Sequence, residues 1–127
     1  MVRLAEIMTA EVFATGPGTP VAEVAAAMVR RRVGSAVVTQ GPAVAGIFTE
    51  RDVLRAAGSG ADLKVAQVSR WMTADPETSG PDLDSEQAIE IMLAGGFRHL
   101  PVMEGTTLLG IVSLRDLLSA GIHHRGA

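Results

Sequence analysis

Cysteine is absent from this sequence, and aromatic residues are few, with three phenylalanines and one tryptophan in 127 residues. The lack of cysteine excludes disulfides, thiol nucleophiles and thiolate metal sites. Eleven basic and 14 acidic residues give a formal net charge of −3, so the chain lacks the basic surface on which nucleic-acid affinity depends. No apolar run approaches the roughly 20 residues that cross a bilayer, and the N-terminus has no signal-peptide pattern. These absences predict a soluble, cytoplasmic protein without nucleic-acid or membrane partners.

An internal repeat dominates what the sequence does contain. Shifting the sequence by 64 residues aligns residues 4–57 with residues 68–121 without a gap and gives 14 identical pairs among 54. Chance pairing at this composition gives roughly four. Each copy, at about 55 residues, is marginal for burying a core alone. The duplication therefore predicts two similar units that pack their apolar faces together.

Each copy shows the same predicted elements, namely an amphipathic turn, a short strand, a helix, a hairpin and a second helix. Thr19 and Asp84 are the predicted N-caps of the first helix in each copy, and Gly34 is expected to end the first of these helices. The expected helices cover residues 20–32, 50–57, 85–94 and 114–121, and the expected strands cover residues 13–15, 35–39, 44–48, 99–103 and 108–112.

We place the first repeat at residues 1–60 and the second at residues 65–122. The chain between their folded parts, residues 57–64, is a connector rich in glycine, serine and alanine. Residues 123–127 are predicted to form a flexible tail. Its adjacent histidines, His123 and His124, have no third ligand in the pattern, so no metal site is predicted.

The most informative stretch covers residues 46–52, where an apolar strand runs directly into a helix, and it returns at residues 110–116. Thr49 is a favourable N-cap, and the helix start is expected to offer unpaired N–H groups that suit a phosphate. Asp52 would repel phosphate, but its two acceptor oxygens suit the neighbouring hydroxyls of a ribose. Arg51 can compensate the charge of a phosphate. This combination favours a nucleotide site.

The same spacing also has a purely structural interpretation. A threonine or serine followed three residues later by an acidic residue at a helix start is a capping box, which needs no ligand. The second copy does little to decide between the two interpretations, because duplication copies caps as well as sites.

Further motifs accompany these stretches: Ile-Met-Thr at residues 7–9, Trp-Met-Thr at residues 71–73, and Arg-His-Leu-Pro-Val at residues 98–102. The ordered set resembles a tandem cystathionine-β-synthase (CBS) domain pair, also called a Bateman module, over nearly the whole chain. The resemblance implies an α/β fold of two pseudo-symmetric β-α-β-β-α repeats packed through their sheets. It also implies clefts between the repeats that bind adenosine-type ligands such as AMP, ADP, ATP or S-adenosylmethionine.

The resemblance also implies which residues contact such a ligand. The residues at the two helix starts fall on the family's phosphate and ribose positions, and residues around 13–15, 36–38, 77–79 and 100–102 fall where the base is held. The candidate residues are Ala14, Thr15, Val37, Thr49, Arg51, Asp52, Thr78, Arg98, His99, Pro101, Ser113, Arg115 and Asp116.

The two copies differ where the resemblance implies a phosphate. Arg98 and His99 stand where the first copy has glycine and serine, and basic residues at that position in the family can reach phosphates. The alternative is that both side chains simply face solvent from a strand. Glu50 is unfavourable near a phosphate unless it points away, and Leu114 is a candidate contact for another subunit. We therefore expect one cleft to accept phosphate better than the other.

Two functions remain open. The first is a regulatory module that senses an adenosine-type ligand and passes the signal through its own homodimer or an effector protein. The second is a nucleotide-free scaffold of the same fold that dimerises and presents an interface. Because pairs of the family often dimerise through their helices, the resemblance implies the apolar faces of helices 21–32 and 85–94 as the dimer interface. An enzyme is not expected, because three histidines and no cysteine suggest no pairing of a base with a nucleophile. No cofactor is required in either case.

Overall fold

The computed structural model describes the backbone of residues 1–126 and the side chains of residues 1–121. The chain forms two compact units. Phe13–Pro76 form one, which we call the middle unit, and Met1–Val12 combine with the chain from Glu77 onward in the other, which we call the terminal unit. Among the described residues, no helix is both long and apolar enough to span a membrane.

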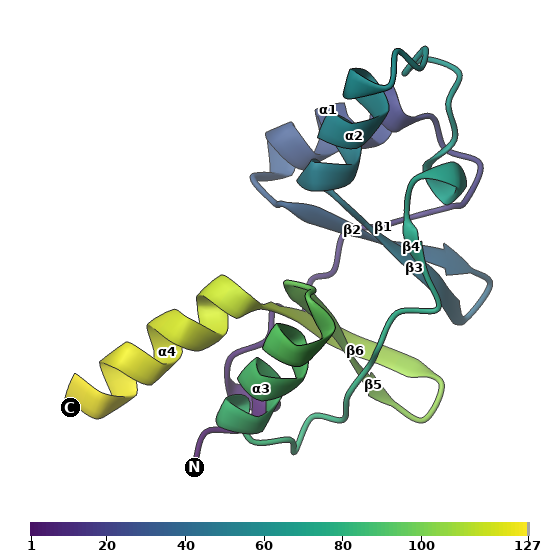
Figure 1. Cartoon of the computed structure of the whole chain (residues 1–127). Coiled ribbons are helices and arrows are strands. Elements are labelled where there is room, and N and C mark those ends of the chain that lie inside the picture. The colour runs from purple at the N-terminus through teal and green to yellow at the C-terminus, as the bar shows by residue number, and fades with distance from the viewer. Residues whose placement is uncertain (127) are drawn as a thin grey trace. The chain divides into compact units, whose positions relative to one another are not determined.

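The middle unit contains a sheet with the strand order β1-β2-β3-β4. The antiparallel hairpin of β2 and β3 forms its centre, β1 pairs with β2 in parallel, and β4 pairs with β3 antiparallel. In Figure 1 the helices α1 and α2 lie on the same side of this sheet. The elements are β1 (Ala14–Thr15), α1 (Val21–Arg31), β2 (Ser35–Gln40), β3 (Ala43–Thr49), α2 (Glu50–Gly58), the 3₁₀ helix η2 (Val68–Arg70) and β4 (Thr73–Ala74).

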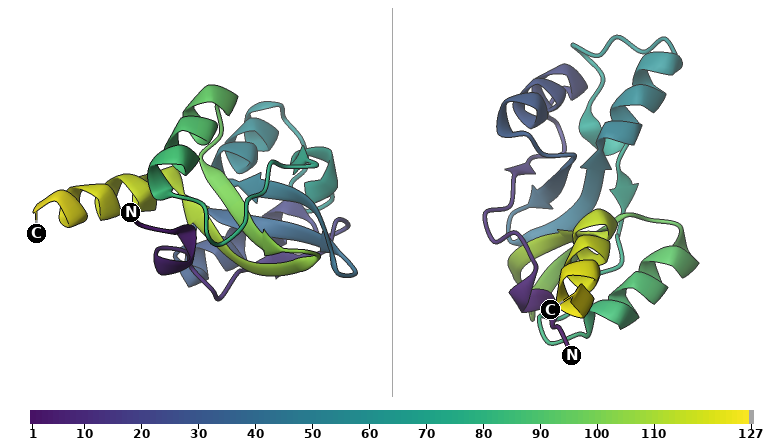
Figure 2. Two further views of the ribbon diagram at one scale, coloured as in Figure 1. Left: turned by 90° about the horizontal axis from the view of Figure 1, so that it is seen from below. Right: turned by 90° about the vertical axis from the view of Figure 1, so that its left-hand side faces the viewer.

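The terminal unit repeats this plan around a second antiparallel hairpin, β5–β6. In place of the short outer strands it has two isolated bridges, Thr9 with Ile111 and Ser79 with Val102. The first corresponds to the pairing of β4 with β3 in the middle unit, and the second to the pairing of β1 with β2. Both views of Figure 2 show the purple N-terminal segment beside the green hairpin. The elements are the 3₁₀ helix η1 (Leu4–Glu6), α3 (Ser85–Gly95), β5 (His99–Glu104), β6 (Thr107–Ser113) and α4 (Leu114–Gly126).

The opening segment of each sequence repeat packs with the hairpin of the other repeat. A Cβ atom on Gly46 would lie 2.7 Å from the carbonyl oxygen of Thr73, and a Cβ atom on Gly110 would lie 2.8 Å from that of Thr9. Only glycine leaves room for a neighbouring backbone at this distance. The two glycines of the repeated motif are therefore explained by close packing of backbone against backbone.

A separate apolar core lies in each unit, built from one face of the hairpin and the helices that cover it. Alternation along a strand places Val37 and Pro101 on the opposite face from these cores. The middle core contains Val21, Val24, Met28, Ala36, Val38, Phe48, Ala56 and Val68. The terminal core contains Leu4, Ala88, Met92, Leu100, Val102, Val112 and Leu117.

The predicted α/β fold is confirmed, and the predicted helices and strands agree with those of the structure to within one residue except at the end of α4.

The start of α1 differs from the prediction. Its N-cap is Pro20 rather than Thr19, whose hydroxyl oxygen instead accepts the Thr15 hydroxyl hydrogen at 2.8 Å. A side-chain cap is not required here, because the Val21 and Ala22 amides donate to the carbonyl oxygens of Ala66 and Leu63, each at 2.8 Å.

The C-terminal ends of α1 and α4 also differ from the prediction. Arg32, with φ 56°, forms the left-handed C-cap of α1, where we expected the helix to end at Gly34. The equivalent residue after α3 is Gly96, which adopts the same conformation without a steric cost. The backbone of α4 continues to Gly126 rather than ending near residue 121. The side chains of the tail predicted at residues 123–127, and residue 127 altogether, lie outside the described residues.

Candidate functional site

Each compact unit brings together one set of the candidate residues. Ala14 pairs with Val37 in the middle sheet, and His99 lies opposite Ser113 in the terminal hairpin. The middle unit holds Ala14, Thr15, Val37, Thr49, Arg51 and Asp52. The terminal unit holds Thr78, Arg98, His99, Pro101, Ser113, Arg115 and Asp116.

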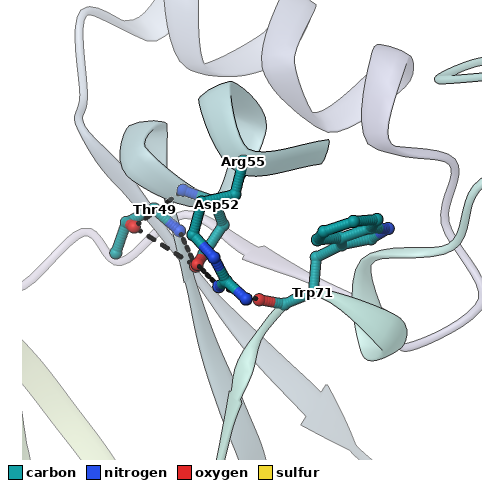
Figure 3. Close-up of polar contacts among 4 residues, drawn as sticks. All are labelled: Thr49, Asp52, Arg55 and Trp71. Carbon is teal, nitrogen blue, oxygen red and sulfur yellow. Dashed lines mark hydrogen bonds and ion pairs between the residues drawn. The ribbon is translucent and has the colours of Figure 1, made fainter. Parts of the chain in front are cut away.

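At the start of α2, the side chains of Thr49 and Asp52 form a reciprocal capping box (Figure 3). The Thr49 amide donates to Asp52 Oδ2 at 2.9 Å, and the Thr49 hydroxyl donates to the same oxygen at 3.2 Å. In return, the Asp52 amide donates to Thr49 Oγ1 at 3.4 Å. The Asp52 side chain is only 8% exposed. The capping-box interpretation is therefore confirmed for the first copy.

Arg55 occupies the other oxygen of the same carboxylate. Its Nη1 donates to Asp52 Oδ1 at 2.9 Å, which makes an ion pair between residues about one helical turn apart. The guanidinium carbon lies 5.7 Å from the centroid of the Trp71 ring, and Nη1 also reaches the Trp71 carbonyl oxygen at 3.5 Å. Both oxygens of Asp52 thus have donors from within the middle unit, as Figure 3 shows.

The first amides of both helices are also engaged. The Glu50 amide donates to the Gly34 carbonyl at 3.1 Å, and the Leu114 amide donates to the Arg98 carbonyl at 2.8 Å. Together with the amides of the capping box, these bonds use most of the donors at the helix starts. The expectation that each start presents a set of unpaired N–H groups to a phosphate is therefore wrong. Recognition of a phosphate here would depend on side chains.

The side chains at the start of α4 make fewer hydrogen bonds than those at the start of α2. Ser113 Oγ accepts the Asp116 amide at 3.0 Å, which leaves the hydroxyl hydrogen for an acceptor. Among the described residues, no hydrogen bond or ion pair engages the Asp116 carboxylate. Asp116 is exposed, as are its neighbours in this region Arg98 and Arg115. This helix start therefore combines a hydroxyl donor, a free carboxylate and two cations.

The first residues of α4 and α2, Leu114 and Glu50, differ in their surroundings. Leu114 is half-buried and packs against the terminal core, and its contact with another subunit stays a prediction. The Glu50 carboxyl group lies beside Gly34, where a Cβ atom would be 3.6 Å from it. The middle unit therefore has an acidic group next to the glycine whose counterpart in the terminal unit is Arg98.

The candidates for holding a base lie beside the hairpins. Val37 and Pro101 are buried, whereas Ala14 and Thr78 are exposed. The Thr15 hydroxyl is half-buried and donates to another threonine. Contact of these residues with a base stays a prediction.

Exposed apolar side chains recur at equivalent positions of the two copies. Val29 on α1 is 77% exposed, and its counterpart Leu93 on α3 is 65% exposed. Leu54 on α2 and its counterpart Leu118 on α4 are exposed as well. Each unit therefore presents apolar surface on both of its helices.

A family model of the CBS domain matches the chain twice, at residues 4–59 and 65–123. The chain belongs to the CBS domain family. An uncharacterised 17.7 kDa protein of Acidianus ambivalens is 39% identical to this CBS pair over 120 residues, which cover 93% of the chain and 72% of that protein. The resemblance inferred from the motifs is confirmed.

Solved structures share the fold of this CBS pair. The CBS-domain containing protein ATU1752 from Agrobacterium tumefaciens is 38% identical with a TM-score of 0.81, and the match covers 87% of this chain and 90% of that chain. The CBS domain pair of protein MJ0100, in complex with 5′-methylthioadenosine and S-adenosyl-L-methionine, has a TM-score of 0.87 at 16% identity, with 98% of each chain covered. At that level of identity the likeness concerns the fold alone.

The motifs of the CBS pair did not single out Arg55 or its contact with Trp71. The signal for the ion pair was present in the sequence, because residues three apart on a helix lie on one face. The contact with Trp71 had no such signal, since it joins a helix to the opening segment of the second repeat. Among the described residues, no group of three His, Asp or Glu side chains is placed to hold a metal ion.

Proposed function

We propose that this CBS pair is a regulatory module that binds an adenosine-type ligand, namely AMP, ADP, ATP or S-adenosylmethionine. The signal passes through a homodimer of the chain or to an effector protein. The observation that carries the proposal is the start of α4, where the exposed carboxylate of Asp116 has no partner among the described residues and the Ser113 hydroxyl keeps its hydrogen.

The chemistry of these groups suits a nucleoside with an anionic tail. A carboxylate accepts hydrogen bonds from both hydroxyls of a ribose. The Ser113 hydroxyl can donate to a phosphate or carboxylate oxygen, and Arg98 and Arg115 supply positive charge. An exposed helix start with these side chains therefore offers separate partners for the sugar and for the acidic group.

The ligand class is also motivated by the fold. The CBS domain pair of MJ0100 is known in complex with two adenosine compounds. Because that protein shares only the fold with this chain, the residues around Asp116 carry the argument for binding here.

A nucleotide-free scaffold is the second candidate function. The internal capping box of Asp52 favours it, because that carboxylate has a structural role without any ligand. The exposed Val29 and Leu93 also favour it, since they give both units apolar surface for a second copy of the chain. A homodimer is compatible with both candidates, so ligand binding is what separates them.

A thermal-shift panel with AMP, ADP, ATP and S-adenosylmethionine separates the two functions. A ligand at about 100 times its Kd stabilises the folded chain by about 2.7 kcal/mol. We expect at least one of the four to raise the Tm of the wild-type chain, and we expect the Asp116→Ala variant to lose that response. No shift with any of the four, confirmed by isothermal titration calorimetry, would leave the scaffold as the function.

The proposal treats the chain as a non-catalytic module of the cytoplasm. Without cysteine, the chain has no thiol nucleophile, and its composition suggests no other pairing of a nucleophile with a base. We expect each bound nucleotide to be recovered unchanged after prolonged incubation, as chromatography of the released ligand would show. Turnover that follows the purified protein through a final column would contradict this.

A further inference from the structure

The two motif copies keep the same aspartate but give it different neighbours. In the middle unit, Oδ2 of Asp52 receives two hydrogen bonds from Thr49, and Oδ1 receives the Arg55 guanidinium. The Thr49 hydroxyl hydrogen is used in the same network. The hydroxyl hydrogen is therefore committed, and the carboxylate, which already accepts three hydrogen bonds, is only 8% exposed to a ligand.

Arg55 is itself held in place. Its guanidinium lies over the Trp71 ring and donates to the Trp71 carbonyl oxygen, so it is anchored to a segment outside its own helix. The arginine side chain is 58% exposed, whereas the carboxylate that it covers is almost fully buried. Arg55 therefore lies between Asp52 and solvent.

The terminal unit lacks both parts of this arrangement. Ser119 stands 64 residues after Arg55, and Ile7 stands 64 residues before Trp71. Serine cannot pair with a carboxylate as an ion, and isoleucine offers no aromatic face to a cation. Asp116 is accordingly exposed and without an ionic partner among residues 1–121.

We propose that Arg55 is an internal latch that withholds Asp52 from ligands, so that this CBS pair binds one adenosine-type ligand per chain, at the motif of residues 113–116. The inference rests on the proposed function and adds which motif copy serves it. Arg55 is the residue that makes the two copies unequal.

The chemistry of the competition supports the latch. A ribose hydroxyl is a neutral donor, whereas the guanidinium makes a charge-assisted hydrogen bond to the same carboxylate, which is the stronger type. A ligand at Asp52 would have to break that bond and expose a carboxylate that is now buried. An anionic ligand would also meet the Glu50 carboxyl group, which lies beside Gly34. Asp116 is exposed and has no ionic partner among the described residues, and the counterpart of Glu50 in this copy is the uncharged Leu114.

Exchanging the aligned residues Arg55 and Ser119 between the two copies tests the latch. Arg55→Ser introduces the serine of the terminal copy and removes the cation that pairs with Asp52, and Ser119→Arg places an arginine three residues after Asp116. Arg70→Ser is the matched control, because it also removes an exposed arginine of the middle unit but touches neither aspartate. Each protein is titrated by isothermal titration calorimetry with the four compounds of the thermal-shift panel.

We expect one equivalent of ligand for the wild-type chain and for Arg70→Ser, and two for Arg55→Ser. For Ser119→Arg we expect a Kd weakened by about tenfold or more, equivalent to about 1.4 kcal/mol. Two equivalents for the wild-type chain, or one for Arg55→Ser, would overturn the latch while leaving the proposed function intact. No binding by any of the proteins would overturn the proposed function and the inference together.

A measurement without ligand tests the contact itself. In a double-mutant cycle of Asp52→Asn and Arg55→Ser, followed by urea unfolding, the latch predicts a non-zero interaction free energy between the two residues. The same cycle on Asp116→Asn and Ser119→Ala should give none. An Asp52–Arg55 coupling equal to zero within error would overturn the latch whatever the binding data show.

Discussion

The close approach of two backbones at Gly46 leads to the most quantitative prediction. In a Gly46→Ala variant the new methyl group would lie 2.5 Å from the Met72 sulfur and 2.7 Å from the Thr73 carbonyl oxygen. The methionine side chain can move, but the carbonyl belongs to β4, which pairs with β3 at this point. The strand must shift, and overpacking of this kind costs about 1–3 kcal/mol.

For a chain of this length, that loss corresponds to a fall in Tm of about 3–15 °C. Differential scanning calorimetry of the variant without ligand measures it. Gly58→Ala is the matched control, because nothing lies within 4 Å of a Cβ atom at that position at the end of α2. We expect the control to match the wild-type Tm or exceed it, since alanine restricts the unfolded chain. Equal Tm values for Gly46→Ala and the wild type would show that β4 does not pack this closely on β3.

Three further predictions concern a helix end, a cap and the apolar surface. Arg32→Gly should raise the free energy of unfolding by about 1 kcal/mol, because glycine adopts the left-handed C-cap without strain, and Gly96→Ala should lower it by a similar amount. Urea unfolding that shows Gly96→Ala to be more stable than Arg32→Gly would contradict this. Asp52→Ala should lower the free energy of unfolding by about 1–2 kcal/mol, because the N-cap amide and an arginine lose their acceptor, and an unchanged urea midpoint would argue against it. Val29→Glu combined with Leu93→Glu should convert a dimer to a monomer in sedimentation velocity with little change in Tm, since both side chains are exposed, whereas a dimer that persists would place the interface elsewhere.

Most local structure could be predicted because each signal lies within a few residues. The apolar spacing of residues 21–28 defines one face of α1, and Thr49 begins α2 in the predicted way. The repeat doubled each signal. It could also have corrected one error, since Gly96 aligns with Arg32 and marks the position where the first helix ends.

The assignment of opening segments to hairpins could not be predicted. Residues 8–9 and 72–73 have the same Met-Thr sequence, and Gly46 and Gly110 are equivalent as well. Either segment could therefore pack on either glycine, and local sequence holds no information that distinguishes the two pairings. The contact of Trp71 with Arg55 depends on that pairing, so it could not be foreseen either.

The inequality of the two motif copies was expected, but for a different reason. The sequence suggested that Arg98 and His99 favour one cleft through phosphate, whereas the structure adds that the carboxylate of the other copy is already paired. The motif positions alone do not reveal this, because Asp52 and Asp116 are the same residue. The sequence does hold the difference three residues later, where Arg55 aligns with Ser119, but that position lies outside the motif.

The most direct test of the account is a ¹⁵N-resolved NMR titration of the wild-type chain with the compound that gives the largest thermal shift. The account predicts that the amides of residues 113–116 shift in a saturable way while those of residues 49–52 stay within the scatter of the remaining signals. Saturable shifts at residues 49–52, or none at residues 113–116, would contradict it.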